Sequence, residues 1–108
     1  VTHGVGGTVY TNGTFEMYGG TLKGGKALSV KKDDNTYSGG IGGAVNVNGT
    51  FNMYGGEITG GNASNMGGNI YGIYDATIYI YGGNILDGTA AKGGNLAINA
   101  GANMRVYA

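Results

Sequence analysis

The stretch Thr14-Phe-Glu-Met-Tyr-Gly-Gly20 recurs 36 residues later as Thr50-Phe-Asn-Met-Tyr-Gly-Gly56, with one change in seven positions. A third copy reads Thr77-Ile-Tyr-Ile-Tyr-Gly-Gly83, and a fourth reads Asn103-Met-Arg-Val-Tyr107. In each copy apolar residues alternate with other residues at period two, which is the pattern of a half-buried β-strand. Internal repetition of this kind predicts a repeat architecture before any other feature is considered.

Glycine pairs punctuate the chain between these copies. Of the 26 glycines, 20 fall in ten Gly-Gly pairs. In each of the first two units, the opening Gly-Gly pair is followed by two more pairs at regular spacing. In the third unit, Asp87-Gly88 stands where the third pair is expected. Glycine reaches positive φ without strain, so we expect the pairs to form tight corners between short strands. The units start 36, 25 and 26 residues apart, at Gly6, Gly42, Gly67 and Gly93.

Each unit contains three short strands, which cannot bury an apolar face alone, so neighbouring units must supply the partners. We therefore expect each unit to form one coil, with coils stacked in parallel at a spacing of about 4.8 Å. Stacking predicts that equivalent positions form columns inside the cylinder, and all four columns are apolar. The columns are Val9, Val45, Ile70 and Leu96; Phe15, Phe51, Ile78 and Met104; Met17, Met53, Ile80 and Val106; and Leu22, Ile58 and Ile85.

The columns predict an all-β fold, a parallel β-helix of about four coils with three short strands per coil. One domain then spans residues 1–108, with coils at approximately 4–39, 40–65, 66–91 and 92–108. The first coil is about ten residues longer than the next two, which predicts a loop insertion at about 27–38. Inserted loops often carry function, but we favour a solvated bulge without a partner. Its charge run is a candidate surface contact and comprises Lys31, Lys32, Asp33 and Asp34.

Two kinds of side chain are expected to stack on the outside or at the corners. The tyrosine column consists of Tyr18, Tyr54, Tyr81 and Tyr107. Its rings offer flat apolar faces and hydroxyl tips that suit a sugar ring, but self-stacking that stabilises the coil is the interpretation we favour. Asparagine tolerates corner geometry and can hydrogen-bond to the neighbouring coil. The corner asparagines are Asn12, Asn48, Asn62 and Asn84.

The unit from Gly42 to Asn62 (Gly-Gly-Ala-Val-Asn-Val-Asn-Gly-Thr-Phe-Asn-Met-Tyr-Gly-Gly-Glu-Ile-Thr-Gly-Gly-Asn) resembles the Gly-rich repeats of large bacterial surface proteins. Those are adhesin-like proteins with a right-handed parallel β-helix of the pectate-lyase type, common in anaerobic gut Firmicutes. The resemblance covers essentially the whole chain. It implies right-handed coils, a secreted or cell-surface location and a passive, extended scaffold, and it does not imply a ligand.

Composition argues against several classes of function. Six Lys and Arg balance six Asp and Glu, so the basic patch of a nucleic-acid-binding protein is not expected. No apolar run is long enough to span a bilayer, and without cysteine no disulfide or thiolate zinc site can form. His3 is the only histidine, and we predict no metal ion and no cofactor.

Enzymes that process polysaccharides also use this fold, so the distribution of acidic residues among the columns bears on catalysis. No two carboxylates share a column, and only Asp33 and Asp34 are adjacent, in the predicted loop. Glycoside hydrolysis usually needs two carboxylates within about 5 to 9.5 Å of each other. Arg105, the only arginine, has no acidic cluster in its coil. We predict that the chain is not an enzyme.

The ends of the chain leave two interpretations open. The sequence starts at Val1 rather than Met and shows no polar cap, as expected of a piece of a longer β-helix. Alternatively, open ends join other copies into a filament. We therefore predict an extracellular structural or adhesive β-solenoid that self-associates through open ends. The alternative is a carbohydrate-binding or polysaccharide-processing β-helix, with host or matrix carbohydrate as its partner.

Overall fold

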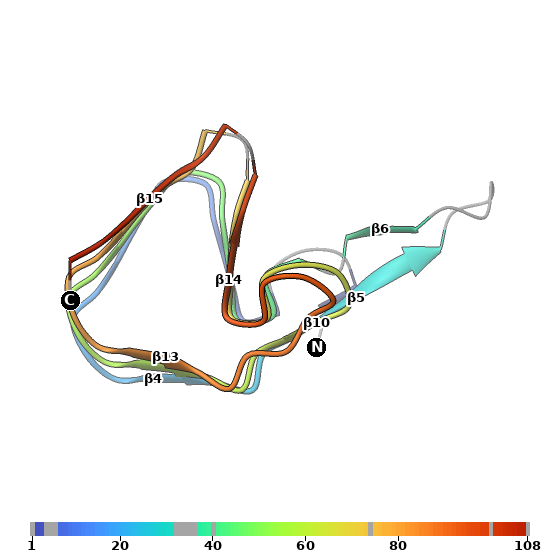
Figure 1. Ribbon diagram of the computed structural model, residues 1–108, viewed down its shortest axis with the longest axis horizontal. Coiled ribbons are helices and arrows are strands. Elements are labelled where there is room, and N and C mark those ends of the chain that lie inside the picture. The colour runs from blue at the N-terminus through green and yellow to red at the C-terminus, as the bar shows by residue number, and fades with distance from the viewer. Residues whose placement is uncertain are drawn as a thin grey trace.

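The structure is a computed structural model that describes residues 2–3, 7–31, 37–39, 41–73, 75–99 and 101–107. All regular secondary structure in these residues is β-strand, and none of them lies in a helix. The predicted all-β class is therefore confirmed. Viewed down the shortest axis, segments far apart in the sequence follow the same path and lie on one another (Figure 1). This arrangement is consistent with a parallel β-solenoid.

Three sheets contain only parallel strands. The first sheet has the order β14 (Leu96–Ile98), β11 (Ile70–Gly72), β7 (Val45–Val47) and β2 (Val9–Thr11). The second has the order β15 (Asn103–Val106), β12 (Thr77–Ile80), β8 (Thr50–Met53) and β3 (Thr14–Met17). The third has the order β13 (Asn84–Leu86), β9 (Glu57–Thr59) and β4 (Thr21–Lys23).

The register of these sheets confirms the four predicted columns. In the second sheet, for example, Phe51 pairs with Phe15 on one side and with Ile78 on the other. The remaining columns pair in the same way. Burying one such side chain contributes about 1.5–3 kcal/mol, so the columns are the main source of stability. Their fully buried members are Val45, Phe51, Met53, Ile58, Ile70 and Ile78.

One corner shows why glycine recurs at a fixed place. The residue that begins this corner has a positive φ in three successive units, 73° at Gly24, 69° at Gly60 and 56° at Asp87. Among the described residues, Asp87 is the one non-glycine residue with positive φ. Aspartate tolerates this left-handed region better than most residues. Asp87-Gly88 therefore occupies the place of a glycine pair, as the sequence predicts.

The prediction of three strands per unit missed a fourth sheet. Its parallel strands are β1 (Thr2–His3), β5 (Lys26–Lys31) and β10 (Asn62–Ala63). Asn62 also bridges to Thr89 in the following unit. A strand as short as β10 is too brief for alternation at period two to be recognised, so the sequence pattern gave no signal.

The expected loop at 27–38 is partly a β-hairpin. β5 extends to Lys31, and β6 (Tyr37–Gly39) pairs with its second half in antiparallel fashion. The two strands project away from the other sheets (Figure 1). Lys31 belongs to β5, whereas Lys32, Asp33 and Asp34 lie outside the described residues.

The two central strands of the first sheet are also covered on their outer face, whereas Tyr10 on β2 is 45% exposed. β7 and β11 are buried at every position, so Asn46 and Tyr71 are buried although they alternate with core residues. Gly67 passes so closely that an added Cβ would lie 2.8 Å from the Cβ of Tyr71. The side-chain amide of Asn46 has no hydrogen-bond partner among the described residues.

A buried asparagine ties neighbouring corners together. Asn69 Oδ1 accepts a hydrogen bond from the backbone N–H of Gly61 at 2.8 Å. Its Nδ2 donates to the carbonyl of Leu86 at 2.9 Å and to Asn95 Oδ1 at 2.7 Å. These bonds satisfy a buried amide and link three segments that are distant in sequence.

The corner asparagines behave partly as predicted. Asn48 Nδ2 donates to Asn12 Oδ1 at 2.9 Å, which confirms the expected link between units. Asn62 and Asn84 lie instead at the first positions of β10 and β13. The hydrogen bond between the buried Asn69 and the exposed Asn95 was not predicted.

Gly61→Ala tests the close approach of Gly61 to the Gly68 carbonyl, at the corner where Asn69 accepts a hydrogen bond from Gly61. A Cβ on residue 61 would lie 2.2 Å from the carbonyl oxygen of Gly68 and 2.6 Å from Asn69 Oδ1. The backbones must therefore separate, and we expect the free energy of unfolding to fall by at least about 2 kcal/mol in chemical denaturation. Gly13→Ala is the matched control, because nothing lies within 4 Å of a Cβ there. It should change stability by less than about 0.5 kcal/mol, and equal effects would contradict the close approach.

Candidate functional site

The tyrosine column forms a continuous stack on the surface. Each ring follows the last residue of a strand in the second sheet, so the sheet sets the spacing of the rings. Ring centroids are 4.9 Å apart for Tyr18 and Tyr54, 5.1 Å for Tyr54 and Tyr81, and 5.0 Å for Tyr81 and Tyr107. Interplanar angles are 9°, 4° and 3° in the same order. The separation matches the spacing of neighbouring strands, about 4.7–4.9 Å.

Stacking decides which part of each ring is available to a ligand. Tyr54 and Tyr81 have a ring neighbour on both faces, so they present edges and hydroxyl groups to solvent. Tyr18 and Tyr107 each keep one face that no other member of the column covers. A sugar ring that packs on an aromatic face therefore has access only at the two ends of the column.

Tyr79 joins this surface, which sequence reasoning did not predict. Its ring lies 6.1 Å from that of Tyr81 and 6.4 Å from that of Tyr107, tilted by 32° and 34°. Tyr79 points to the same outer face of the second sheet as Glu16, Asn52 and Arg105, which pair with one another along one row. Tyr79 and Tyr81 are two residues apart, and side chains at that spacing along a strand point to the same face. This alternation was the signal that could have placed Tyr79 beside the tyrosine column.

Glu16 contacts two members of the tyrosine column. The hydroxyl groups of Tyr18 and Tyr54 both donate to Glu16 Oε2 over 3.4 Å, a long and exposed contact. Burial raises the pKa of the Tyr54 hydroxyl, and the negative charge of Glu16 adds to the increase.

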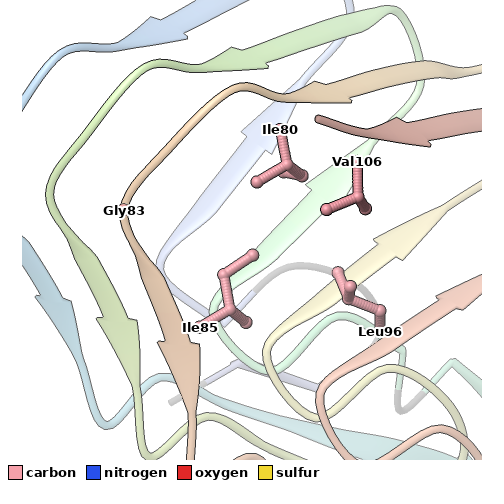
Figure 2. Close-up of a pocket in the computed structure, with 5 residues that line it drawn as sticks. All are labelled: Ile80, Gly83, Ile85, Leu96 and Val106. Atoms are coloured by element: carbon pink, nitrogen blue, oxygen red, sulfur yellow. The ribbon is translucent and has the colours of Figure 1, made fainter. Parts of the chain in front are cut away.

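A small apolar pocket lies at the end of the core where the last strands stack. Its volume is about 240 Å³, below the 300–1,000 Å³ typical of sites for cofactors and drug-sized ligands. Figure 2 shows four side chains converging on it from β12, β13, β14 and β15. We call it the end pocket, and its lining residues are Ile80, Gly83, Ile85, Leu96 and Val106.

The acidic residues are dispersed. Glu16 pairs in register with Asn52, and Glu57 lies between Thr21 and Asn84. The described part of the chain holds no group of three or more His, Cys, Asp or Glu residues that could bind a metal ion. Within the same residues, no helix is of a length and hydropathy that would cross a membrane.

The sequence-predicted site residues thus fall into two groups. The structure brings Tyr18, Tyr54, Tyr81 and Tyr107 together, whereas the charge run of the hairpin is described only at the backbone of Lys31. Comparison of the chain with protein-family models, with curated proteins and with solved structures gives no match.

Truncation within the tyrosine column should cost more at its centre than at its end. Tyr54→Ala removes two stacked pairs and Tyr18→Ala removes one, and such a pair contributes about 0.5–1.5 kcal/mol. We expect Tyr54→Ala to lower the free energy of unfolding by about 2 kcal/mol and Tyr18→Ala by about half as much. A double-mutant cycle on Tyr54 and Tyr81 should give a positive coupling energy. A cycle on Tyr54 and the unstacked Tyr10 is the control, and equal coupling in both would contradict the stack.

Proposed function

We propose that the chain is a structural or adhesive β-solenoid outside the cell. In this proposal the parallel sheets belong to a right-handed β-helix of about four coils, at approximately 4–39, 40–65, 66–91 and 92–108. The observation that carries the proposal is the in-register pairing of every unit with the next through columns of matched residues. Such pairing gives an element that grows along one axis by repetition.

Stiffness would come from three sets of contacts that repeat at the strand spacing. Backbone hydrogen bonds join neighbouring units at the corners as well as in the strands, for example from Tyr54 N–H to the Met17 carbonyl at 2.8 Å. The apolar columns exclude water from the interior. The tyrosine column and the asparagine pairs add side-chain contacts of the same period. A scaffold of this kind resists bending and local unfolding because each unit is held from both sides.

The proposed location rests on the resemblance given above. The Gly42–Asn62 unit is similar to repeats of adhesin-like bacterial surface proteins, and on that basis we propose a secreted or cell-surface protein. No catalytic role is part of this proposal, and the end pocket is too small for a polysaccharide.

The alternative is a carbohydrate-binding β-helix. Exposed tyrosine favours it, since Tyr18 is 70% and Tyr107 56% accessible to solvent. Stacking limits such binding to the outer faces of these two rings. Saturable quenching of tyrosine fluorescence by an oligosaccharide, reduced in Tyr18→Ala and in Tyr107→Ala and lost in the double variant, would support this alternative over a passive scaffold.

The proposed function is tested on intact cells of the source organism. We expect an antibody against residues 41–99 to label unpermeabilised cells, and the labelled segment to survive a protease that digests an unfolded control protein. The physical reason for survival is that cleavage requires several coupled units to open together. Labelling that appears only after permeabilisation would contradict the location, and rapid digestion of the folded chain would contradict the structural role.

A further inference from the structure

The tyrosine column holds phenol rings of neighbouring units against each other. Tyr18 of the first unit and Tyr54 of the second stack with their centroids 4.9 Å apart and their planes 9° from parallel. They follow equivalent strand positions, because β3 and β8 pair in register up to the residue before each ring. Both rings are open to solvent, with an exposure of 70% for Tyr18 and 42% for Tyr54. A soluble oxidant can therefore reach two phenols that the sheet already holds side by side.

Proximity, more than exposure, sets this pair apart. Tyr10 on β2 is 45% exposed, yet among the described residues it makes no ring contact. Two groups held next to each other react without waiting for a chance encounter, which multiplies the rate of a coupling step. The rings must still tilt toward each other to form a bond, and exposed side chains change rotamer within picoseconds to nanoseconds. Stacked neighbours are therefore the favoured partners for coupling.

One carboxylate lies against both hydroxyl groups of the pair. Glu16 Oε2 is 3.4 Å from the hydroxyl oxygen of Tyr18 and 3.4 Å from that of Tyr54. A tyrosine phenol carries its proton at neutral pH, so loss of an electron must be accompanied by loss of that proton. A base at the hydroxyl group assists such a step. In the described part of the chain no carboxylate is hydrogen-bonded to Tyr81 or Tyr107, so Glu16 favours oxidation of the first two rings.

We propose that this pair is a site of oxidative modification, at which a haem peroxidase with hydrogen peroxide joins Tyr18 to Tyr54 by a dityrosine bond. Each phenol loses one electron to the oxidised haem and one proton to Glu16, which passes it to water before the next. The two phenoxyl radicals couple through a carbon ortho to each oxygen. The hydrogen on each coupling carbon then moves to the oxygen of its ring, so both rings become phenols again. One hydrogen peroxide takes up the two electrons and two protons and becomes two water molecules.

The bond links two successive units covalently in a chain that has no cysteine for a disulfide. It closes a loop between residues 18 and 54, and a cross-link that closes a loop restricts the unfolded chain. It also keeps the two units from separating when the stack opens locally. The role as a covalent lock rests on the proposed structural function, whereas the reaction itself rests only on the stacked pair.

Peptide mapping of the oxidised 108-residue chain tests the proposal. The chain is treated in dilute solution with a haem peroxidase and hydrogen peroxide, and the monomer is digested with trypsin. A bond between Tyr18 and Tyr54 joins the peptide of residues 1–23 to that of residues 33–92, with a summed mass lower by two hydrogen atoms. A bond between Tyr54 and Tyr81 would lie within 33–92, and one between Tyr81 and Tyr107 would join 33–92 to 106–108. We expect the first product to dominate, with a yield that does not depend on chain concentration.

Conservative variants identify the residues that react. Tyr18→Phe keeps a stacked ring but removes the hydroxyl group, and it should abolish the joined peptide. Tyr10→Phe is the matched control, because Tyr10 is exposed and lies in the same tryptic peptide, and it should leave the yield unchanged. Glu16→Gln should slow formation of the bond about threefold, a modest loss because water also accepts the proton at exposed hydroxyl groups. Glu57→Gln on the third sheet is its control and should have no effect.

The outcomes separate this inference from the proposed function. A joined peptide that survives Tyr18→Phe, or dityrosine found only between chains, overturns the site, and an unchanged rate in Glu16→Gln overturns the role of Glu16. The cross-linked monomer should unfold at a higher urea concentration than Tyr18→Phe treated in the same way, and equal midpoints overturn the lock. A chain that resists protease but yields no joined peptide leaves the proposed function intact. Rapid digestion of a chain that does form the bond would contradict the structural function and not the reaction.

Discussion

Parallel pairing in register obliges each residue to lie against its own equivalents at about 4.8 Å. Only side chains that tolerate their own kind can fill such columns, and aliphatic, aromatic and amide groups do so. Like charges at that spacing repel. The chain accordingly has only twelve formally charged Asp, Glu, Lys and Arg residues, and Glu16, Glu57 and Arg105 each lie beside uncharged partners within their rows.

The corners obey a second constraint, the contact of backbone with backbone. Where segments of neighbouring units meet, a side chain has no room, as at Gly61 against the Gly68 carbonyl. Glycine makes the unfolded chain flexible, so each corner needs fixed partners in the fold. Asn69 supplies them by bonding to Gly61, Leu86 and Asn95 at once. Core columns and corner contacts together position the tyrosine column.

Sequence reasoning predicted the features that local patterns mark and missed those that only pairing or packing reveals. The columns and the Asp87 corner could be predicted because alternation and glycine spacing are local patterns. The fourth sheet was missed because β10 has two residues, and its strands are recognised only by their pairing. Burial of Asn46 and Tyr71 depends on packing that alternation does not reveal, including the turns at Gly42 and Gly67 that lie close against these two residues. Tyr79 contacts the tyrosine column because it lies two residues before Tyr81. The prediction did not use this alternation.

The central claim, parallel stacking in register, is tested most directly by cysteine pairs in a chain that has no natural cysteine. Thr50 and Thr77 are direct partners on β8 and β12, and neighbouring strands lie within the Cα separation that a disulfide accepts, about 4.4–6.8 Å. The double variant Thr50→Cys, Thr77→Cys should form an intramolecular disulfide under mild oxidation. The offset variant Thr50→Cys, Tyr79→Cys should not. Efficient closure of the offset pair, or none of the direct pair, would contradict the account.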